Sequence, residues 1–356
     1  MPKVVEVSKR LQPSPGRSRA PTIRDIAREA GVSVATISRV LNKQAGVAPE
    51  TRDAVLRVIE LRGFTTNPTA RGLAGARTGL ISVTLPMLES SYFGHLTSSV
   101  VEALHEHDLR AVISPTFHQH DREVGLLNRL MHGTTEGAIL VLPSESAEEL
   151  DALGEHGYPF VVIDPKAPLG EDTPCVSAGN VAGARDLTLH LLGLGHRRVG
   201  VITGPRGWNA TEERLTGFYG ALAGAGVMPV PELQVESDWT LEGGRAAGPL
   251  LFDLPEPPTA VFAFNDNLAI GAIQAARARG LRVPEDVSVA GFDDSDEAPL
   301  LTPGLTSVRQ PLAEMGRIAV GMLMRLLDGH PVDALTVELP TRLVVRGSTV
   351  SAFPLP

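Results

Sequence analysis

Short, continuous apolar runs separated by helix-length segments constrain the fold of most of this chain. A first series comprises LISVTL from residue 80, AVIS from 111, AILVL from 138 and FVVI from 160; a second comprises VGVI from 199, AVFAF from 260 and VSVAGF from 287. Runs that are apolar throughout, without polar alternation, indicate strands buried on both faces of a parallel sheet. The two series predict two doubly wound α/β domains.

Further elements follow the second series. The segment from Pro311 to Leu327 is predicted to be a helix, because it carries apolar residues at helical spacing. These are Met315, Ile318, Ala319, Met322 and Leu323. Two strand-like pieces, ALTVELP and RLVVRGS, come next. We expect the chain to cross back between the two domains here.

The most specific local pattern is TIRDIAREAGVSVATISRVLN, residues 22–42. An apolar stripe indicates a two-turn helix that Thr22 is placed to cap. The stripe consists of Ile23, Ile26, Ala27 and Ala30. Gly31 can take the left-handed conformation that ends such a helix. Ser33 suits the N-cap of a second helix.

The second helix completes a helix-turn-helix pattern, in which the second helix lies in the DNA major groove. Its predicted buried stripe is Val34, Ile37 and Leu41, and its opposite face carries Ala35, Ser38, Arg39 and Asn42. Arg39 can pair with a guanine edge, while Ser38, Thr36 and Asn42 offer short donors to phosphates. The alternative is a helical hairpin inside a larger core.

A third helix is predicted to begin at Pro49, a residue favoured in the first turn of a helix. Its expected apolar stripe is Ala54, Val55, Val58 and Leu61. Residues 65–79, TTNPTARGLAGARTG, contain too few apolar residues to pack and predict a connector. Residues 1–20, rich in Pro and Ser, are expected to be disordered.

Charge is divided unevenly along the chain. Residues 1–77 contain 14 Lys and Arg against 6 Asp and Glu, whereas the remainder contains 18 against 35. A basic end on an acidic body is expected if one end alone binds nucleic acid. An accidental basic tail would account for part of the asymmetry, since several of the charges lie in the leader.

The single cysteine, Cys175, cannot form an internal disulfide, which predicts a reducing, cytoplasmic location. No run reaches the roughly 18 apolar residues of a membrane helix, and MPKVVEVSKR lacks the apolar segment of a secretory signal. We therefore expect no membrane partner.

The stretch from Thr22 to Asn42 resembles the head of the lactose-repressor and galactose-repressor (LacI/GalR) family, which begins with a run such as T-I-x-D-I-A-x-x-A-G-V-S-x-x-T-V-S-R-V-L-N. The resemblance implies that Val34, Ala35 and Arg39 read operator bases and that Thr36 and Ser38 contact the backbone. Thr22, Ser33 and Asn42 belong to the same expected DNA-binding set.

The sequence NPTARGL from Asn67 resembles the family's hinge helix, which folds only on operator DNA. Carried over, Leu73 enters the minor groove, Ala70 packs near the partner hinge, and Asn67 and Arg71 contact the backbone. A flexible linker is the alternative.

The rest of the chain is similar to the family's periplasmic-binding-protein-like body, which holds a ligand between two subdomains. The expected division is a leader at 1–20, a helix-turn-helix head at 21–66, a hinge at 67–78, one subdomain at 79–178 with 310–338, and the other at 179–309 with 339–356. The family's tetramer-forming C-terminal heptad helix is absent, since the sequence stops at SAFPLP. The resemblance therefore implies a homodimer.

Ligands bind beyond the carboxyl ends of the strands in open α/β sheets. Asp164, Asn265, Asp266 and Asp293 lie there, and short carboxylates and amides suit vicinal hydroxyls. The alternative is that Asp164 ends a strand and that Asp293 and its neighbour Asp294 form a turn.

The resemblance adds Arg214, Trp239 and Phe93 to the effector site, and Gln310 is a further candidate from its position. The resemblance implies that Arg214 grips sugar hydroxyls or a ligand anion and that Trp239 stacks on the ligand ring. A lone Trp is otherwise a core residue. Phe93, in SSYF, and Gln310, before the return helix, complete the expected effector site.

Enzyme motifs are missing: the sequence has no G-x-x-x-x-G-K-[ST], G-x-S-x-G, H-E-x-x-H or suitably placed G-x-G-x-x-G. The pairs His105/His107 and His118/His120 lack a Cys cluster or an acidic partner beside them, so solvated histidines are expected, with no metal or cofactor. Asp164 and Asp293 facing across a cleft would imitate a glycosidase pair, the enzyme alternative.

The resemblance thus implies a dimeric transcriptional regulator that binds double-stranded operator DNA of pseudo-palindromic sequence. Repression with release by an inducer is the commoner sign in the family, and corepression is the alternative. A small effector, a sugar or sugar derivative, is expected between the body subdomains and changes operator affinity. One alternative is a sugar-binding module without DNA activity, but such a module would lack the helix-turn-helix head. The other alternative is a DNA-binding protein whose body only dimerises, which would show no ligand-dependent change in operator affinity.

Overall fold

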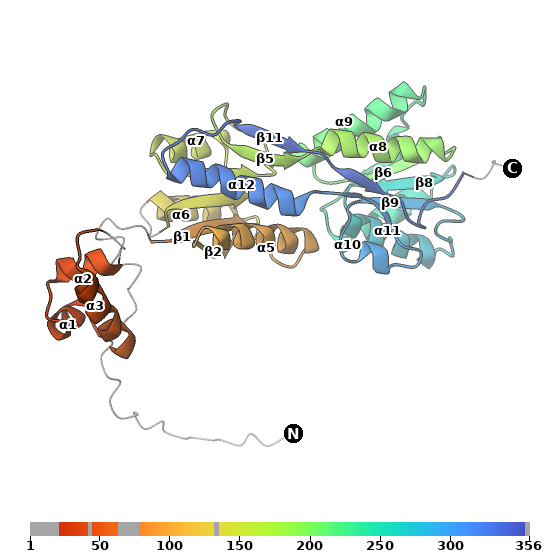
Figure 1. Ribbon diagram of the computed structural model, residues 1–356. Coiled ribbons are helices and arrows are strands. Elements are labelled where there is room, and N and C mark those ends of the chain that lie inside the picture. Colours follow the sequence, from red (N-terminus) through yellow and green to blue (C-terminus); the bar gives the residue numbers. More distant parts are fainter. Residues whose placement is uncertain (1–20, 42–44, 63–77, 132–134, 353–356) are drawn as a thin grey trace, which may run out of the picture. The chain divides into compact units, whose positions relative to one another are not determined.

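The computed structural model describes residues 21–41, 45–62, 78–131 and 135–352. The chain divides into two compact units, residues 1–77 and 78–356 (Figure 1). In the part described, no helix is long and apolar enough to cross a lipid bilayer.

The first unit contains three helices, α1 (Ile23–Glu29), α2 (Val34–Leu41) and α3 (Pro49–Arg62). Thr22 caps α1 as predicted, in a reciprocal capping box with Asp25. Gly31 has a left-handed φ of 66° at the turn, and the Ser33 hydroxyl accepts a hydrogen bond from the amide of Thr36 at 3.1 Å. The predicted helix-turn-helix therefore forms with its expected caps.

The core of the head differs from the predicted stripes at two positions. Its buried residues are Ile26, Ala27, Ile37, Val40 and Val55. Val34 is 41% exposed and Leu61 is 82% exposed, so their predicted burial was wrong. Val34 is the first residue of α2 and Leu61 lies in the last turn of α3. Both residues are therefore at helix ends, outside the buried core of the head. Val40 supplies the buried contact on α2 instead.

The second unit contains two six-stranded sheets. The first has the order β11-β5-β4-β3-β1-β2 and is parallel throughout. Its strands are β1 (Leu80–Leu85), β2 (Arg110–Pro115), β3 (Gly137–Val141), β4 (Phe160–Ile163), β5 (Cys175–Ala178) and β11 (Thr336–Leu339).

The second sheet has the order β12-β10-β9-β8-β6-β7, and only β12 runs antiparallel to its neighbour. Its strands are β6 (Val199–Thr203), β7 (Gln234–Glu236), β8 (Ala260–Ala263), β9 (Ser288–Asp293), β10 (Thr306–Arg309) and β12 (Arg342–Val344). The predicted fold, an all-α head with two doubly wound α/β domains, is confirmed.

Helices cover both faces of each sheet (Figure 1). On the first sheet α5 (Ser91–Glu106) and α12 (Leu312–Leu327) share one face, and α6 (His120–Met131) and α7 (Ala147–Glu155) share the other. On the second sheet α8 (Asn180–Gly193) and α9 (Asn209–Gly224) lie opposite α10 (Leu241–Phe252) and α11 (Asp266–Ala278). Ile139 of β3 packs beneath α5 and α12, whereas its neighbour Leu140 packs on the α7 side. This two-sided burial explains the continuous apolar runs.

Within residues 135–352 the chain passes three times between the sheets. It passes from β5 to α8 at Gly179, from β10 to α12 at Gln310 and Pro311, and from β11 to β12 at residues 340–341. The expected return helix is α12, which packs against α5 of the first sheet. Each sheet with its helices thus forms one lobe, and three neighbouring segments of the chain connect the two lobes.

Helices α8 and α9 approach closely because Gly217 has no side chain. A Cβ atom on Gly217 would lie 2.2 Å from the carbonyl oxygen of Val181, whereas one on Gly220 of the same helix would meet nothing within 4 Å. Gly217 therefore fixes the separation of the two helices, and Gly220 does not.

We expect Gly217→Ala to lower the free energy of unfolding by about 1–3 kcal/mol through overpacking. The matched change Gly220→Ala should raise it by roughly 0.5–1 kcal/mol, since Ala favours a helix more than Gly. Denaturant unfolding of the two variants measures both values. Equal effects would contradict the close approach.

Candidate functional site

A cavity of about 820 Å³ lies at the carboxyl ends of the parallel strands of both sheets. Asp164 follows β4 and Leu142 follows β3 in the first lobe, while Asn265 follows β8 and Asp293 ends β9 in the second. The volume falls in the upper part of the roughly 300–1,000 Å³ range of small-molecule sites. Residues of both lobes therefore line the cavity.

Seven of the eight predicted effector residues line this cavity. They are Phe93, Asp164, Arg214, Trp239, Asn265, Asp293 and Gln310. Asp266 is the exception, because it is buried behind the lining. Its carboxylate accepts hydrogen bonds from the Ser307 hydroxyl at 2.6 Å and the Ser295 amide at 2.7 Å. Burial raises the pKa of Asp266 to about 8. This side chain joins the ends of β9 and β10 instead of facing a ligand.

Backbone strain is concentrated around the cavity. Eight non-glycine residues in the described part of the chain have left-handed φ angles, and five of them line the cavity. These are His118, Leu142, Asp164, Trp239 and Asp293, with φ between 49° and 111°. Such conformations cost about 1–3 kcal/mol each and cluster at ligand sites. The strained turns aim the side chains at the strand ends into one space.

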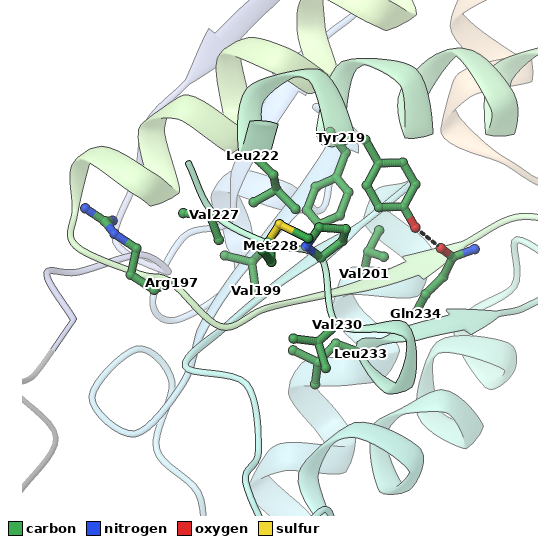
Figure 2. A pocket seen from close by; sticks show the side chains of 12 residues that line it. Arg197, Val199, Val201, Tyr219, Leu222, Val227, Met228, Val230, Leu233 and Gln234 are labelled. Atoms are coloured by element: carbon green, nitrogen blue, oxygen red, sulfur yellow. Dashed lines mark hydrogen bonds between the residues drawn. The ribbon is translucent and has the colours of Figure 1, made fainter. Parts of the chain in front are cut away.

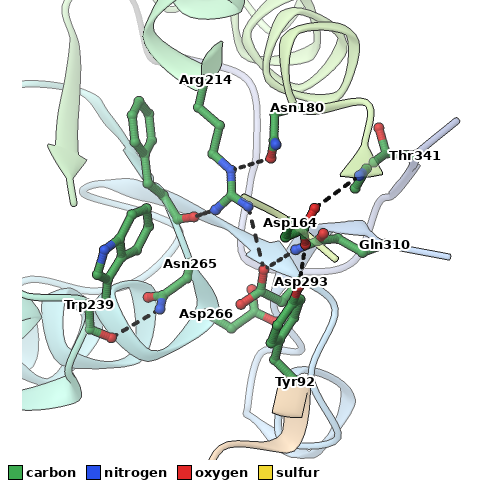
Figure 3. A network of polar contacts seen from close by, with 12 residues as sticks. Tyr92, Asp164, Asn180, Arg214, Trp239, Asn265, Asp266, Asp293, Gln310 and Thr341 are labelled. Atoms are coloured by element: carbon green, nitrogen blue, oxygen red, sulfur yellow. Dashed lines mark hydrogen bonds and ion pairs between the residues drawn. The ribbon is translucent and has the colours of Figure 1, made fainter. Parts of the chain in front are cut away.

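Arg214 is buried, and neighbouring groups engage it on every side (Figure 3). Its Nε donates to Oδ1 of Asn180 at 2.8 Å, and Nη1 donates to the carbonyl oxygen of Phe264. Its Nη2 lies 4.0 Å from Oδ1 of Asp293, and its Cζ is 3.7 Å from the Phe292 ring centroid. These partners compensate the buried charge and hold the guanidinium in one orientation.

Two of the aspartates that line the cavity, Asp164 and Asp293, are held from different elements (Figure 3). Gln310 Nε2 donates to Asp293 Oδ1 at 2.7 Å, the Tyr92 hydroxyl donates to Asp164 Oδ2, and the Ala178 amide donates to Asp164 Oδ1 at 3.2 Å. Burial raises the pKa of Asp164, and it raises the pKa of Asp293 to about 6 against the opposing effect of Arg214. The aspartates are therefore oriented acceptors as well as the turn residues that the alternative described.

Trp239 lies directly on the backbone of Gly204. A Cβ atom on Gly204 would stand 2.0 Å from the indole. Asn265 fixes the other side, because its Nδ2 donates to the Trp239 carbonyl at 3.0 Å while its Oδ1 caps α11 at the Leu268 amide at 2.8 Å. Trp239 is thus packed against the core and lines the cavity at once.

Several lining residues escaped the sequence reasoning: Tyr92, His118, Lys166, Asn180, Trp208 and Glu213. Tyr92 precedes Phe93, and the polar contact to Asp164 comes from Tyr92. His118 is exposed, as expected of a surface histidine, and its ring also lies 5.7 Å from that of Trp208. The glycine-rich GPRGW after β6 was the one available signal for Trp208.

A second hollow beneath α9 carries no such chemistry (Figure 2). Its lining is largely apolar, including Val199, Val201 and Leu222, and its volume of about 10 Å³ corresponds to about one water. It is a packing gap. Among the described residues, no group of three or more His, Cys, Asp or Glu is arranged to hold a metal.

Helix α2 exposes the face that the sequence assigned to DNA. Ser33, Val34, Ala35, Ser38 and Arg39 are exposed and Thr36 is half-buried, while Ile37 and Val40 point into the core. Thr22 uses its hydroxyl to cap α1. The remaining predicted DNA contacts lie outside the described residues: Asn42, Asn67, Ala70, Arg71 and Leu73.

A helix-turn-helix head on a two-lobed α/β body with a polar cavity defines the class of DNA-binding regulators with a periplasmic-binding-protein-like body. Residues 22–67 match the bacterial regulatory proteins of the lacI family, and residues 188–349 match the periplasmic binding protein-like domain. The HTH-type transcriptional regulator DegA of Bacillus subtilis (strain 168) is 34% identical, covering 92% of this chain and 98% of DegA. The chain belongs to the LacI family, and it is a DNA-binding transcriptional regulator, not an enzyme.

Solved structures show the same relationship. The Lac repressor dimer bound to operator and the anti-inducer ONPF aligns with a TM-score of 0.83 at 26% identity, covering 93% of this chain and 100% of that chain. The transcriptional regulator CelR in complex with cellobiose aligns with a TM-score of 0.71 at 32% identity, covering 92% and 99%.

We expect Gly204→Ala to displace the Trp239 indole, since the added methyl group would occupy its place. In a Trp208→Phe background, where Trp239 is the only indole, the fluorescence emission should shift towards that of a solvated Trp. Gly193→Ala is the control, because a Cβ atom there meets nothing within 4 Å. An unchanged spectrum for Gly204→Ala would disprove the contact.

Proposed function

We propose that this chain represses transcription as a homodimer whose two heads occupy successive major grooves of a pseudo-palindromic operator. The exposed face of α2 supports this proposal, because Ile37 and Val40 anchor the helix and leave Val34, Ala35 and Arg39 available to base edges. Thr36 and Ser38 contact phosphates in this arrangement.

We propose further that a sugar or sugar derivative is the effector and binds in the cavity between the lobes. The observation that carries this proposal is that Asp164, Asp293, Arg214 and Trp239 line the same cavity. Oriented carboxylates accept hydrogen bonds from neighbouring hydroxyls, and an indole face suits the apolar face of a sugar ring. Because the ligand contacts both lobes, its binding changes their relation and is coupled to operator binding by about 1–3 kcal/mol.

The expected division of the chain belongs to the same proposal. The head extends over residues 21–66 and the hinge over 67–78, and the lobes exchange at 178/179, 309/310 and 338/339, close to the three passages between the sheets. The protein acts in the cytoplasm, at the nucleoid.

The test is selection of DNA sites from a random library by the full chain at fixed salt, followed by titration with monosaccharides, disaccharides and sugar phosphates. A pseudo-palindromic site whose affinity changes with one sugar is the expected result. Affinity that is the same with every sugar would overturn the effector proposal and leave the DNA-binding role.

Arg39→Ala should reduce discrimination between operator and random DNA by about 1–3 kcal/mol, the usual cost of losing a base contact. Arg57→Ala, an exposed arginine on α3, should leave discrimination unchanged. Binding titrations on both DNAs measure the difference. An equal loss on operator and random DNA for Arg39→Ala would show that Arg39 contacts phosphate alone.

Sugar affinity should fall as the pH is lowered through about 6, the pKa of Asp293, because protonation removes an acceptor for ligand hydroxyls. Asp266, with a pKa of about 8, stays protonated across this window, and Arg214 stays charged. Calorimetric titrations between pH 5 and 7 should show the fall in the parent and a much smaller fall in Asp293→Asn, in which Asp164, whose pKa burial also raises, is the remaining acid. A pH dependence of the same size in Asp293→Asn would assign it to another group.

A further inference from the structure

We propose that the effector is an oligosaccharide of at least two sugar rings that carries no anionic group, and that Trp208, Lys166 and His118 form a subsite for its second ring. The inference rests on the proposed function, a sugar effector, and specifies the size and charge of that sugar.

Two indoles stand side by side in the cavity. The ring centroids of Trp208 and Trp239 are 5.9 Å apart, with their planes inclined by 43°. Trp239 is close to the buried polar end, since the Arg214 guanidinium lies 5.6 Å from its ring centroid. Trp208 is half-buried, as Trp239 is, and its ring lies 5.7 Å from that of the exposed His118. One sugar ring on each indole would follow this path outwards from the aspartates.

Both lobes build the second subsite. Lys166 follows β4 in the first lobe, and its Nζ lies 4.7 Å from the Trp208 ring centroid. Trp208 is the N-cap of α9 in the second lobe, and the next amide, that of Asn209, donates to the Lys166 carbonyl at 2.8 Å. His118, which has a left-handed φ of 55°, reaches Trp208 from the turn after β2. The indole is therefore held in place without a ligand, as expected for a preformed platform.

The size of the cavity fits more than one ring. Its volume of about 820 Å³ approaches the upper end of the roughly 300–1,000 Å³ occupied by drug-sized ligands. A sugar ring bound at Asp164, Asp293 and Arg214 would occupy only one end of the cavity. A monosaccharide bound there would leave the Trp208 end without a ligand contact.

The charge of the lining disfavours an anion. Among the described residues that line the cavity, seven carry carboxyl groups and two, Lys166 and Arg214, carry permanent positive charge. Arg214 is already engaged by Asn180, the Phe264 carbonyl and Asp293. Burial and the charge of Lys166 lower the pKa of His118, so it adds no positive charge at neutral pH. A phosphate or carboxylate on the ligand would face mainly negative groups.

Calorimetric titration of the full chain tests the proposal with glucose, galactose and xylose, their neutral α- and β-linked disaccharides, glucose 6-phosphate, glucuronic acid and glucosamine. One neutral disaccharide should bind at least tenfold more tightly than each monosaccharide, the anionic glucose 6-phosphate and glucuronic acid included. Trp208→Ala should weaken that disaccharide at least tenfold and leave its component monosaccharide unchanged, and Trp208→Phe should retain most of the affinity.

The other outcomes separate the two proposals. If no sugar binds, the proposed sugar effector falls, and this inference falls with it. If a monosaccharide, sugar phosphate, uronic acid or amino sugar binds as tightly as the best disaccharide, the sugar effector stands and the inference is overturned. Equal losses for disaccharide and monosaccharide in Trp208→Ala would overturn the second subsite. Thermal unfolding of both variants would show whether they fold.

Discussion

The buried charge of Arg214 is the constraint on which the ligand site depends. An arginine removed from water is tolerated only when neighbouring groups replace the lost solvation. Asn180, the Phe264 carbonyl and Asp293 supply that replacement, and they come from α8, the end of β8 and the end of β9. Satisfying one guanidinium thus fixes how these elements meet. Asp293, oriented in turn by Gln310 at the crossing into α12, connects this geometry to the passage between the lobes.

Parallel sheets provide the second condition. All strands that flank the cavity end at the same edge of their sheet, so the residues after them converge. Five non-glycine residues that line the cavity, at strand ends or in nearby turns, have left-handed backbone conformations. The surrounding fold maintains this strain, and its effect is to direct Asp164, Trp239 and Asp293 inward. Where the turn instead directs a carboxylate behind the sheet end, as with Asp266, the group becomes structural.

The two units of the chain carry opposite net charges. The first 77 residues have an excess of basic side chains and the rest of the chain an excess of acidic ones. Attraction to phosphate is therefore concentrated in the first unit. The same acidic character reaches into the cavity, where it disfavours anionic ligands. One compositional asymmetry thus bears on both partners of the protein.

The sequence by itself determined the features that local physical chemistry controls. Caps at Thr22 and Ser33 and a glycine turn define the head, and two-sided burial defines the central strands, because each requires only neighbouring residues. It also located Asp164 and Asp293, since position after a buried strand suffices. It did not reveal β5, β7 and β10, which are short and partly polar. Thr306 and Ser307 of β10 are buried, yet their hydroxyls bond to Thr349 and Asp266 from distant segments.

Only the tertiary structure decided which distant side chains meet, within each lobe and across the lobes. Tyr92 reaches Asp164, Asn180 reaches Arg214 and Lys166 reaches Trp208 through contacts between residues at least 34 positions apart. The exposure of Val34 and Leu61 likewise depends on where neighbouring helices end. Periodicity and capping are encoded within one turn or strand, whereas these contacts depend on how two sheets and their crossing segments pack.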